Sequence, residues 1–169
     1  AFPLRLYWKG IWGFCIVFAQ MKPKIKILGI CGSLEPDSNT MKALGVALEG
    51  AKVSGADVDV VDLREYAIPV FNSPHRFPKS EEHIEKMKNH FRLADGILIA
   101  TPEYHGSLAG ALKNAFDWMG FEEFEGKMVG LIGVAGGETG AFNALDHSRT
   151  VCRQLHAWVI PSQVSIASS

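Results

Sequence analysis

The sequence predicts an α/β fold, a doubly wound, five-stranded parallel sheet covered by helices on both faces. Short apolar runs rich in β-branched residues alternate along the chain with segments whose apolar residues recur at helical spacing. The chain has 169 residues, of which 47% are hydrophobic, enough for one domain with a sizeable core. Strand order 2-1-3-4-5 is one of the two common orders for such a sheet and gives a three-layer sandwich.

The expected strands are apolar runs bounded by turn-forming residues. They lie at residues 25–30, 58–63, 96–100, 128–134 and 158–166. Because Pro102 has no N–H to give to a ladder, we expect the third strand to end there.

The expected helices show apolar residues three or four positions apart, at residues 41–51, 84–94, 108–119 and 142–155. Ser38 or Asn39 is placed to cap the first helix, and Ser80 opens the second. The longest irregular piece, residues 66–79, contains three prolines, and loops of that length are often functional.

Residues 1–20 are expected to be a leader or an upstream extension outside the domain. The apolar stretch Ile11–Ala19 is shorter than the roughly 20 residues of a membrane span. It has the outline of a secretory signal, but we favour translated upstream sequence, because Met21 directly precedes the first expected strand. The domain is assigned to residues 21–169. It stops without a closing helix, which predicts a truncated C-terminus.

Charge and cysteine content limit the classes of partner, the compartment and the metal sites that we expect. A formal net charge of -1 offers no basic excess for a phosphate backbone, so neither nucleic acid nor a membrane is an expected partner. Cys15, Cys31 and Cys152 fit neither a disulfide framework nor a zinc pattern. We therefore expect a reducing, cytoplasmic location and no metal site.

In a doubly wound sheet, ligands bind beyond the carboxyl ends of the strands, where the strand order reverses. The loop after the first strand, residues 32–40, contains the hydroxyls of Ser33, Ser38 and Thr40 and the amide of Asn39. It lacks both the glycine pattern of dinucleotide sites and the Gly-Lys-Ser/Thr of a P-loop. Such a loop can hold a phosphate through N–H groups, hydroxyls and the helix dipole, or it can be an ordinary capped turn.

The loops after the third and fourth strands suit a flat ligand. In the first of these, Tyr104 offers an aromatic surface, His105 a possible donor, and Gly106 a position where backbone can approach a ligand closely. The other, residues 133–140, has four glycines in eight residues. The plainer interpretations are a tyrosine packed in the core, a structural histidine and a flexible turn.

At these three loops the sequence resembles the NADPH-dependent FMN reductase family, which includes quinone, chromate and azo-dye reductases. The match runs from about Lys24 to Ile166. Its most specific part is PEYHGSLAGALKNAFDW, residues 102–118. Residues 32–39 match the family's phosphate loop, residues 135–140 its glycine-rich loop, and Ile68–Asn72 its segment after the second strand. The resemblance implies a flavodoxin-like fold that binds FMN.

The resemblance also implies how the cofactor is held. The phosphate would lie at the hydroxyl-rich loop, through Ser33, Ser38 and Asn39, with Thr40 beside them. The isoalloxazine would lie against the other two loops, largely through backbone groups. Those residues are Pro102, Glu103, Tyr104, His105, Gly106, Ala135, Gly136 and Gly137. No catalytic side chain is required, and Glu103 is expected to be a solvent-facing or capping carboxylate rather than a general base.

The implied activity is hydride transfer from NADPH or NADH to FMN and on to a small electron acceptor: a quinone, chromate, an azo compound or free flavin. A homodimer or homotetramer is implied, with the helix carrying Leu112, Phe116 and Met119 near the subunit contact. One position departs from the family, which usually has Arg after Gly-Ser-Leu. Here it is Glu35, and a carboxylate beside a phosphate repels it unless the side chain points to solvent.

Two other functions stay open. A flavodoxin-type electron carrier would bind FMN without a coenzyme site, and it would usually have an acidic surface, which a net charge of -1 does not favour. An apo interaction or sensing module on the same fold could use Cys31 or Cys152. Oxidation of NADPH or NADH with a quinone separates the enzyme from both, and a yellow colour separates the flavoproteins from the apo module.

Overall fold

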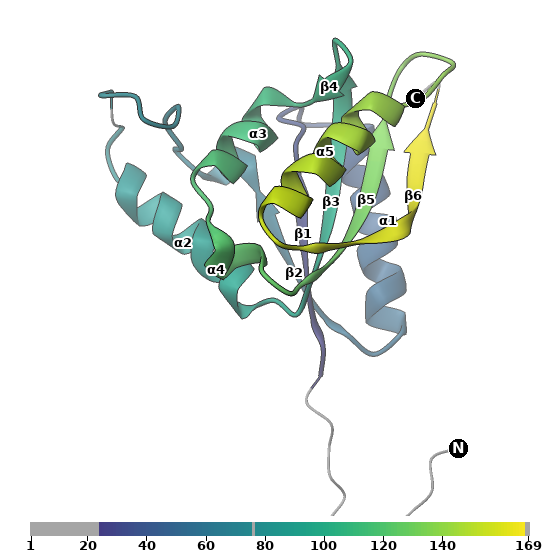
Figure 1. Cartoon of the computed structure of the whole chain (residues 1–169), viewed down its shortest axis with the longest axis horizontal. Helices are drawn as coiled ribbons and strands as arrows, with labels where there is room; N and C mark the ends of the chain where they lie inside the picture. The colour runs from purple at the N-terminus through teal and green to yellow at the C-terminus, as the bar shows by residue number, and fades with distance from the viewer. Residues whose placement is uncertain (1–23, 76, 168–169) are drawn as a thin grey trace, which may run out of the picture.

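Five parallel strands form the middle layer of the fold (Figure 1). The computed structural model describes residues 24–75 and 77–167, so the prediction for residues 1–20 lies outside the described residues. The strand order is β2-β1-β3-β5-β6. The strands are β1 (Lys26–Cys31), β2 (Asp57–Asp62), β3 (Gly96–Tyr104), β5 (Met128–Val134) and β6 (Trp158–Ile166). This confirms the predicted sheet, to which a short β4 (Ser107–Leu108) adds one antiparallel pairing with β3.

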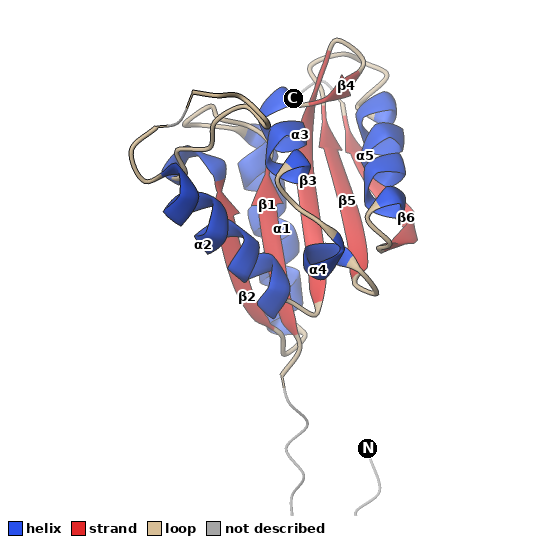
Figure 2. Ribbon diagram, turned by 60° about the vertical axis from the view of Figure 1, so that its left-hand side comes forward, coloured by secondary structure: helices blue, strands red, loops and turns tan. Residues whose placement is uncertain are grey.

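Helices cover both faces of the sheet, as the three-layer prediction requires. In Figure 1, α1 (Asn39–Val53) lies behind the sheet. In front of it lie α2 (Ser80–Leu93), α3 (Gly110–Asp117), the short α4 (Phe121–Phe124) and α5 (Phe142–Gln154) (Figure 2). The sequence did not predict α4 or the 3-10 turn Leu63–Glu65, because a single turn shows no helical repeat.

Alternate side chains of the strands point to opposite faces of the sheet and pack in two separate cores. Ile97 and Ile99 pack with the front helices, whereas Ala100 packs with Leu44 and Leu48 of α1. On α3, the apolar side chains point into the front core; Leu112, Phe116 and Met119 are 0%, 3% and 8% exposed. Any subunit contact through this helix would therefore use its outer face.

The expectation that β3 ends at Pro102 is wrong. The strand continues to Tyr104, and Pro102 is the register partner of Val134 in β5. On its other side β3 pairs with β1 only as far as Ala100, which faces Cys31. The Ala100 carbonyl accepts from the N–H of Gly32, the residue directly after β1. Because alternate residues of a strand face the same neighbour, the position of the missing Pro102 N–H faces the side where β1 has already ended.

Both cysteines of the described chain are buried and unpaired. Burial is the main cause that raises the pKa of the Cys31 thiol, and burial raises the pKa of Cys152 to about 12. Both thiols therefore stay protonated at neutral pH, which disfavours a redox-sensing role, since the thiolate is the reactive form.

We predict that a Cys15→Ser variant reacts slowly with iodoacetamide at pH 7.5 while it is folded. The ordinary pKa of 9.0 and the value of about 12 for Cys152 correspond to about a thousandfold less thiolate. Quantified alkylation in buffer and in 8 M urea (roughly the concentration that unfolds most domains) checks this. Rapid labelling of either thiol in the folded protein would contradict the buried placement.

Two glycine substitutions test the packing, because they should change the free energy of unfolding in opposite directions. Gly45 lies on the exposed side of α1 and a methyl group there would meet no atom within 4 Å. Gly45→Ala should stabilise the protein by about 0.5–1 kcal/mol, because alanine is the better helix former. At Gly133 a methyl group would lie 2.7 Å from the Ala141 Cβ and 2.9 Å from the Leu145 Cγ. Gly133→Ala should therefore destabilise by about 1–3 kcal/mol.

Urea unfolding of both variants measures these changes. A neutral Gly133→Ala variant would show that α5 packs less closely on β5 than described.

Candidate functional site

The loops after β1, β3 and β5 meet at the carboxyl edge of the sheet, at the top in Figure 1. Between them is a hollow of about 370 Å³, here called the rim hollow. It is lined by Ser33, Glu35, Asp37, Ser38, Asn39, Thr40, Pro102, Tyr104, Val134 and Gly136. A second hollow of about 370 Å³ shares Glu35 and Tyr104 with it and extends to Ala109, Gly110 and Ala111 at the start of α3. The volumes are those of small-molecule sites.

The first loop turns its hydroxyls toward helix α1. Ser38, rather than Asn39, is the N-cap residue: its Oγ accepts from the N–H groups of Thr40 at 3.1 Å and Met41 at 3.3 Å. Ser33 Oγ accepts from the Glu35 N–H at 3.3 Å. Each hydroxyl thus acts as an acceptor toward backbone and keeps its own proton to donate. With no acidic residue in the first turn of α1, this end of the helix favours an anion.

The second loop is a tight β-hairpin. Tyr104 pairs with Ser107, and between them His105 and Gly106 both have positive φ, 52° and 76°. Positive φ at both central residues is the type I′ geometry that fits the twist of the flanking strands. The buried Thr101 joins the two strands at the base of the hairpin, where its Oγ1 accepts from the Ala109 N–H at 3.0 Å. The hairpin holds Tyr104, half exposed, over both hollows.

Glu103 is a capping carboxylate, as expected. Its Oε2 accepts from the N–H of Ala144 at 3.0 Å, and its Oε1 from the Asn143 Nδ2 at 3.4 Å. The Ala144 N–H is one of the donors that the start of α5 leaves unpaired, so the carboxylate satisfies it and meets the positive end of the helix. The carboxylate is therefore used in structure, and only its backbone is offered to a ligand.

The glycines of the third loop have different roles. Gly140 has φ 74°, and a methyl group there would lie 2.3 Å from the Ser165 Oγ, so the fold itself requires glycine. At Gly136 and Gly137 a methyl group would meet no atom within 4 Å, and φ is not in the left-handed region. The fold does not require glycine at these two positions, and their lack of a side chain leaves room for a ligand to approach the backbone.

The structure brings together most of the predicted cofactor residues. Those lining the rim hollow are Ser33, Ser38, Asn39, Thr40, Pro102, Tyr104 and Gly136. Glu103 is turned to α5, and His105 and Gly106 form the hairpin tip. Ala135 donates its N–H to the Ile166 carbonyl, 2.9 Å away, and Gly137 accepts from Gly140. None of these five lines the hollow.

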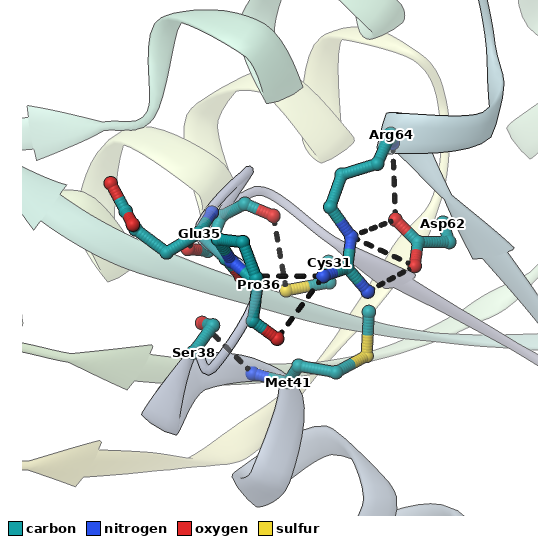
Figure 3. Close-up of polar contacts among 8 residues, drawn as sticks. Cys31, Glu35, Pro36, Ser38, Met41, Asp62 and Arg64 are labelled. Carbon is teal, nitrogen blue, oxygen red and sulfur yellow. Dashed lines mark hydrogen bonds and ion pairs between the residues drawn. The ribbon is translucent and has the colours of Figure 1, made fainter.

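Sequence reasoning missed Arg64, which binds the first loop from the end of β2 (Figure 3). Its side chain pairs with Asp62, with Nε 2.9 Å and 3.0 Å from the two carboxylate oxygens. The hydrogen bonds from Arg64 are the main cause that lowers the pKa of Asp62, so both groups are charged at neutral pH. The sequence could have indicated Arg64 by its position, because it follows the end of a strand at the edge where ligands bind.

Within residues 24–75 and 77–167, no helix combines the length and the apolar composition needed to cross a bilayer. No three His, Cys, Asp or Glu side chains in the same ranges are grouped so that they could hold a metal ion.

Known proteins are similar to this chain in sequence and in fold. The chain is 36% identical over 132 residues to an NAD(P)H-dependent FMN reductase of Pseudomonas aeruginosa, covering 76% of this chain and 70% of that protein. It is 37% identical over 106 residues to an NADPH azoreductase of Bacillus sp. strain OY1-2, covering 63% of this chain and 59% of that protein. The chain thus spans less than two thirds of the azoreductase.

Among solved structures, the flavoenzyme NAD(P)H:(acceptor) oxidoreductase FerB of Paracoccus denitrificans superposes with a TM-score of 0.69 at 24% identity, covering 82% of this chain and 78% of that one. This likeness shows the shared fold. The sequence profile of NADPH-dependent FMN reductases matches residues 25–169, nearly the whole described chain. The chain therefore belongs to the NADPH-dependent FMN reductase family.

Proposed function

We propose that this protein binds FMN and passes a hydride from NADPH or NADH, by way of the flavin, to a small electron acceptor. One observation carries the proposal: a hydroxyl-lined helix N-terminus, the exposed Tyr104 and Gly136, a glycine that the fold does not require, border one hollow. The names of the relatives, an NAD(P)H-dependent FMN reductase and an NADPH azoreductase, support the same activity.

The residues present fit the phosphate of FMN at one end of the rim hollow. Ser33 and Ser38 are buried, have their acceptor sites occupied by backbone N–H groups and can donate their protons to phosphate oxygens. Charge-assisted hydrogen bonds of this kind are the stronger ones. Asn39 adds the first N–H group of α1, whereas the Thr40 N–H is already bound to the Ser38 Oγ.

At the other end of the rim hollow, the residues fit a flat ring. Pro102 and Val134 are buried register partners that provide an apolar floor, Tyr104 stands beside them, and Gly136 leaves room. FMN, when bound, supplies the hydride chemistry, while the protein supplies binding and orientation. No side chain is assigned acid–base work, because Glu103 is held by α5 and His105 lies exposed at the hairpin tip.

The acceptor is proposed by class only: a quinone, an azo compound, chromate or free flavin. The open rim and the second hollow beside Tyr104 support a site that admits planar molecules of several sizes. We also propose a homodimer or homotetramer and a cytoplasmic location; the free, buried thiols of Cys31 and Cys152 support a reducing compartment.

The direct test is purification followed by a visible spectrum and coenzyme oxidation assays. We expect a yellow protein, or one that turns yellow with added FMN, and oxidation of NADPH or NADH that depends on a quinone or azo dye. A colourless protein that does not bind FMN would contradict the proposal. A protein that binds FMN but leaves both coenzymes unoxidised would be an electron carrier.

We predict that Gly136→Val weakens FMN binding by about tenfold or more and leaves the free energy of unfolding within about 0.5 kcal/mol. A Cβ at this position would meet no atom of the protein within 4 Å, so we expect the steric conflict to arise with the bound ring. Fluorescence titration with FMN and urea unfolding measure the two effects. Gly45→Ala, on the exposed side of α1, is the matched control and should leave FMN affinity unchanged. Equal affinity of the valine variant would remove the third loop from the site.

A further inference from the structure

We propose that Arg64 is a positioning residue for the cofactor phosphate: it fixes the peptide planes of the first loop and so makes the protein prefer FMN to riboflavin. The inference rests on the proposed function, since it concerns the same hollow. It assigns a task to a residue that lies on neither the loop nor α1.

The topology places Arg64 beside this loop. Asp62, the last residue of β2, is the register partner of Cys31, the last residue of β1, so the two strands end level. The chain after β1 forms the loop, and the chain after β2 forms the single turn that contains Arg64. From there the guanidinium Nη1 donates to the Pro36 carbonyl at 3.2 Å and, more weakly, to the Glu35 carbonyl at 3.5 Å.

Asp62 holds the guanidinium in this orientation. Its carboxylate binds the Nε at 2.9 Å and also accepts from the Arg64 backbone N–H at 3.0 Å. The side chains are only 34% and 18% exposed, so the pair is partly withdrawn from water. Because Asp62 neutralises much of the Arg64 charge, the main effect of Arg64 on the loop is directional rather than a long-range attraction for phosphate.

Fixing the Pro36 carbonyl fixes the next N–H. The peptide bond between Pro36 and Asp37 is trans, as are all peptide bonds among the described residues, and in a trans peptide the C=O and N–H point in opposite directions. The Pro36 carbonyl is turned to Arg64, so the Asp37 N–H points away from it. Asp37 lines the rim hollow next to Ser38. Pro36 itself has no N–H and a fixed φ, so its ψ angle sets the orientation of this peptide plane, which Arg64 restrains through the carbonyl.

Two carboxylates make the restraint of this backbone important for phosphate binding. Glu35 and Asp37 flank Pro36 and both border the hollow, where a free carboxylate would repel a phosphate. Asp37 is paired with Lys42 at 3.2 Å. In Figure 3 the Glu35 carboxylate points away from Arg64 while its carbonyl is bound by it. Holding the backbone in this arrangement offers an N–H group to the anion.

The test compares two flavins that differ in the phosphate. FMN and riboflavin affinities are measured by fluorescence quenching for the unmodified chain, Arg64→Met, Arg64→Lys and the control Arg153→Met. Arg153 is exposed near the end of α5, so the control removes one positive charge away from the site. Arg64→Met should weaken FMN binding by about fivefold to thirtyfold and riboflavin binding by less than about twofold.

The rescue variant should behave differently from the methionine variant. Lysine can donate to one of the two carbonyls, so Arg64→Lys should recover part of the FMN affinity. The control should keep the original ratio of the two affinities. Urea unfolding accompanies each titration, since a loss of folded protein lowers both affinities alike.

Each result decides between interpretations. An unchanged ratio of FMN to riboflavin affinity in Arg64→Met overturns the inference and leaves the proposed function intact. Equal loss of both affinities assigns Arg64 a purely structural role and also overturns it. If the unmodified protein binds neither flavin, the proposed function fails first, and the inference about Arg64 fails with it.

Discussion

The site depends on strands of unequal length at one edge of the sheet. The pairing of β1 with β3 ends at Cys31 and Ala100, whereas β3 and β5 stay paired as far as Pro102 and Val134. Two extra residue pairs extend the rim by about 7 Å beyond β1, at roughly 3.3 Å per residue. The loop that follows β1 lies in the space beside these two extra residue pairs. Its hydroxyls and the apolar side chains of Pro102 and Val134 therefore border the same hollow.

A close contact at Gly32 maintains this difference in length between β1 and β3. Gly32 donates its N–H to the Ala100 carbonyl at 2.8 Å, the last bond before the chain leaves the sheet. A side chain at Gly32 would meet the Leu112 Cβ at 3.0 Å and the Thr101 Oγ1 at 3.2 Å. Thr101 in turn holds the base of the hairpin through the Ala109 N–H. The start of the first loop, the hairpin and α3 are thus joined at one point, and a larger residue at Gly32 would separate all three.

The sequence predicted the sheet because its central strands β1, β3 and β5 are largely buried, which produces the continuous apolar runs typical of a covered parallel sheet. It predicted Ser38 as a possible cap because capping is local. Pro102 was misjudged for the opposite reason: whether a missing N–H matters depends on which neighbour that position faces, and the neighbour comes from residues about seventy positions earlier. Arg64 was missed on the same ground, since its partners Glu35 and Pro36 lie 29 and 28 positions away.

The charges around the hollow are arranged so that backbone, rather than charged side chains, faces the ligand. Glu103 is bound by the start of α5, Asp62 and Arg64 are bound to each other, and Asp37 is paired with Lys42. Glu103 orients the start of α5, and Arg64, held by Asp62, orients peptides of the first loop. A binding surface of N–H groups, hydroxyls and small residues discriminates weakly among planar molecules, because it offers few side chains that reject the wrong shape. We therefore expect the proposed acceptor site to discriminate weakly among planar molecules, and Glu35, which lines both hollows, is the charged side chain placed to influence the choice of coenzyme.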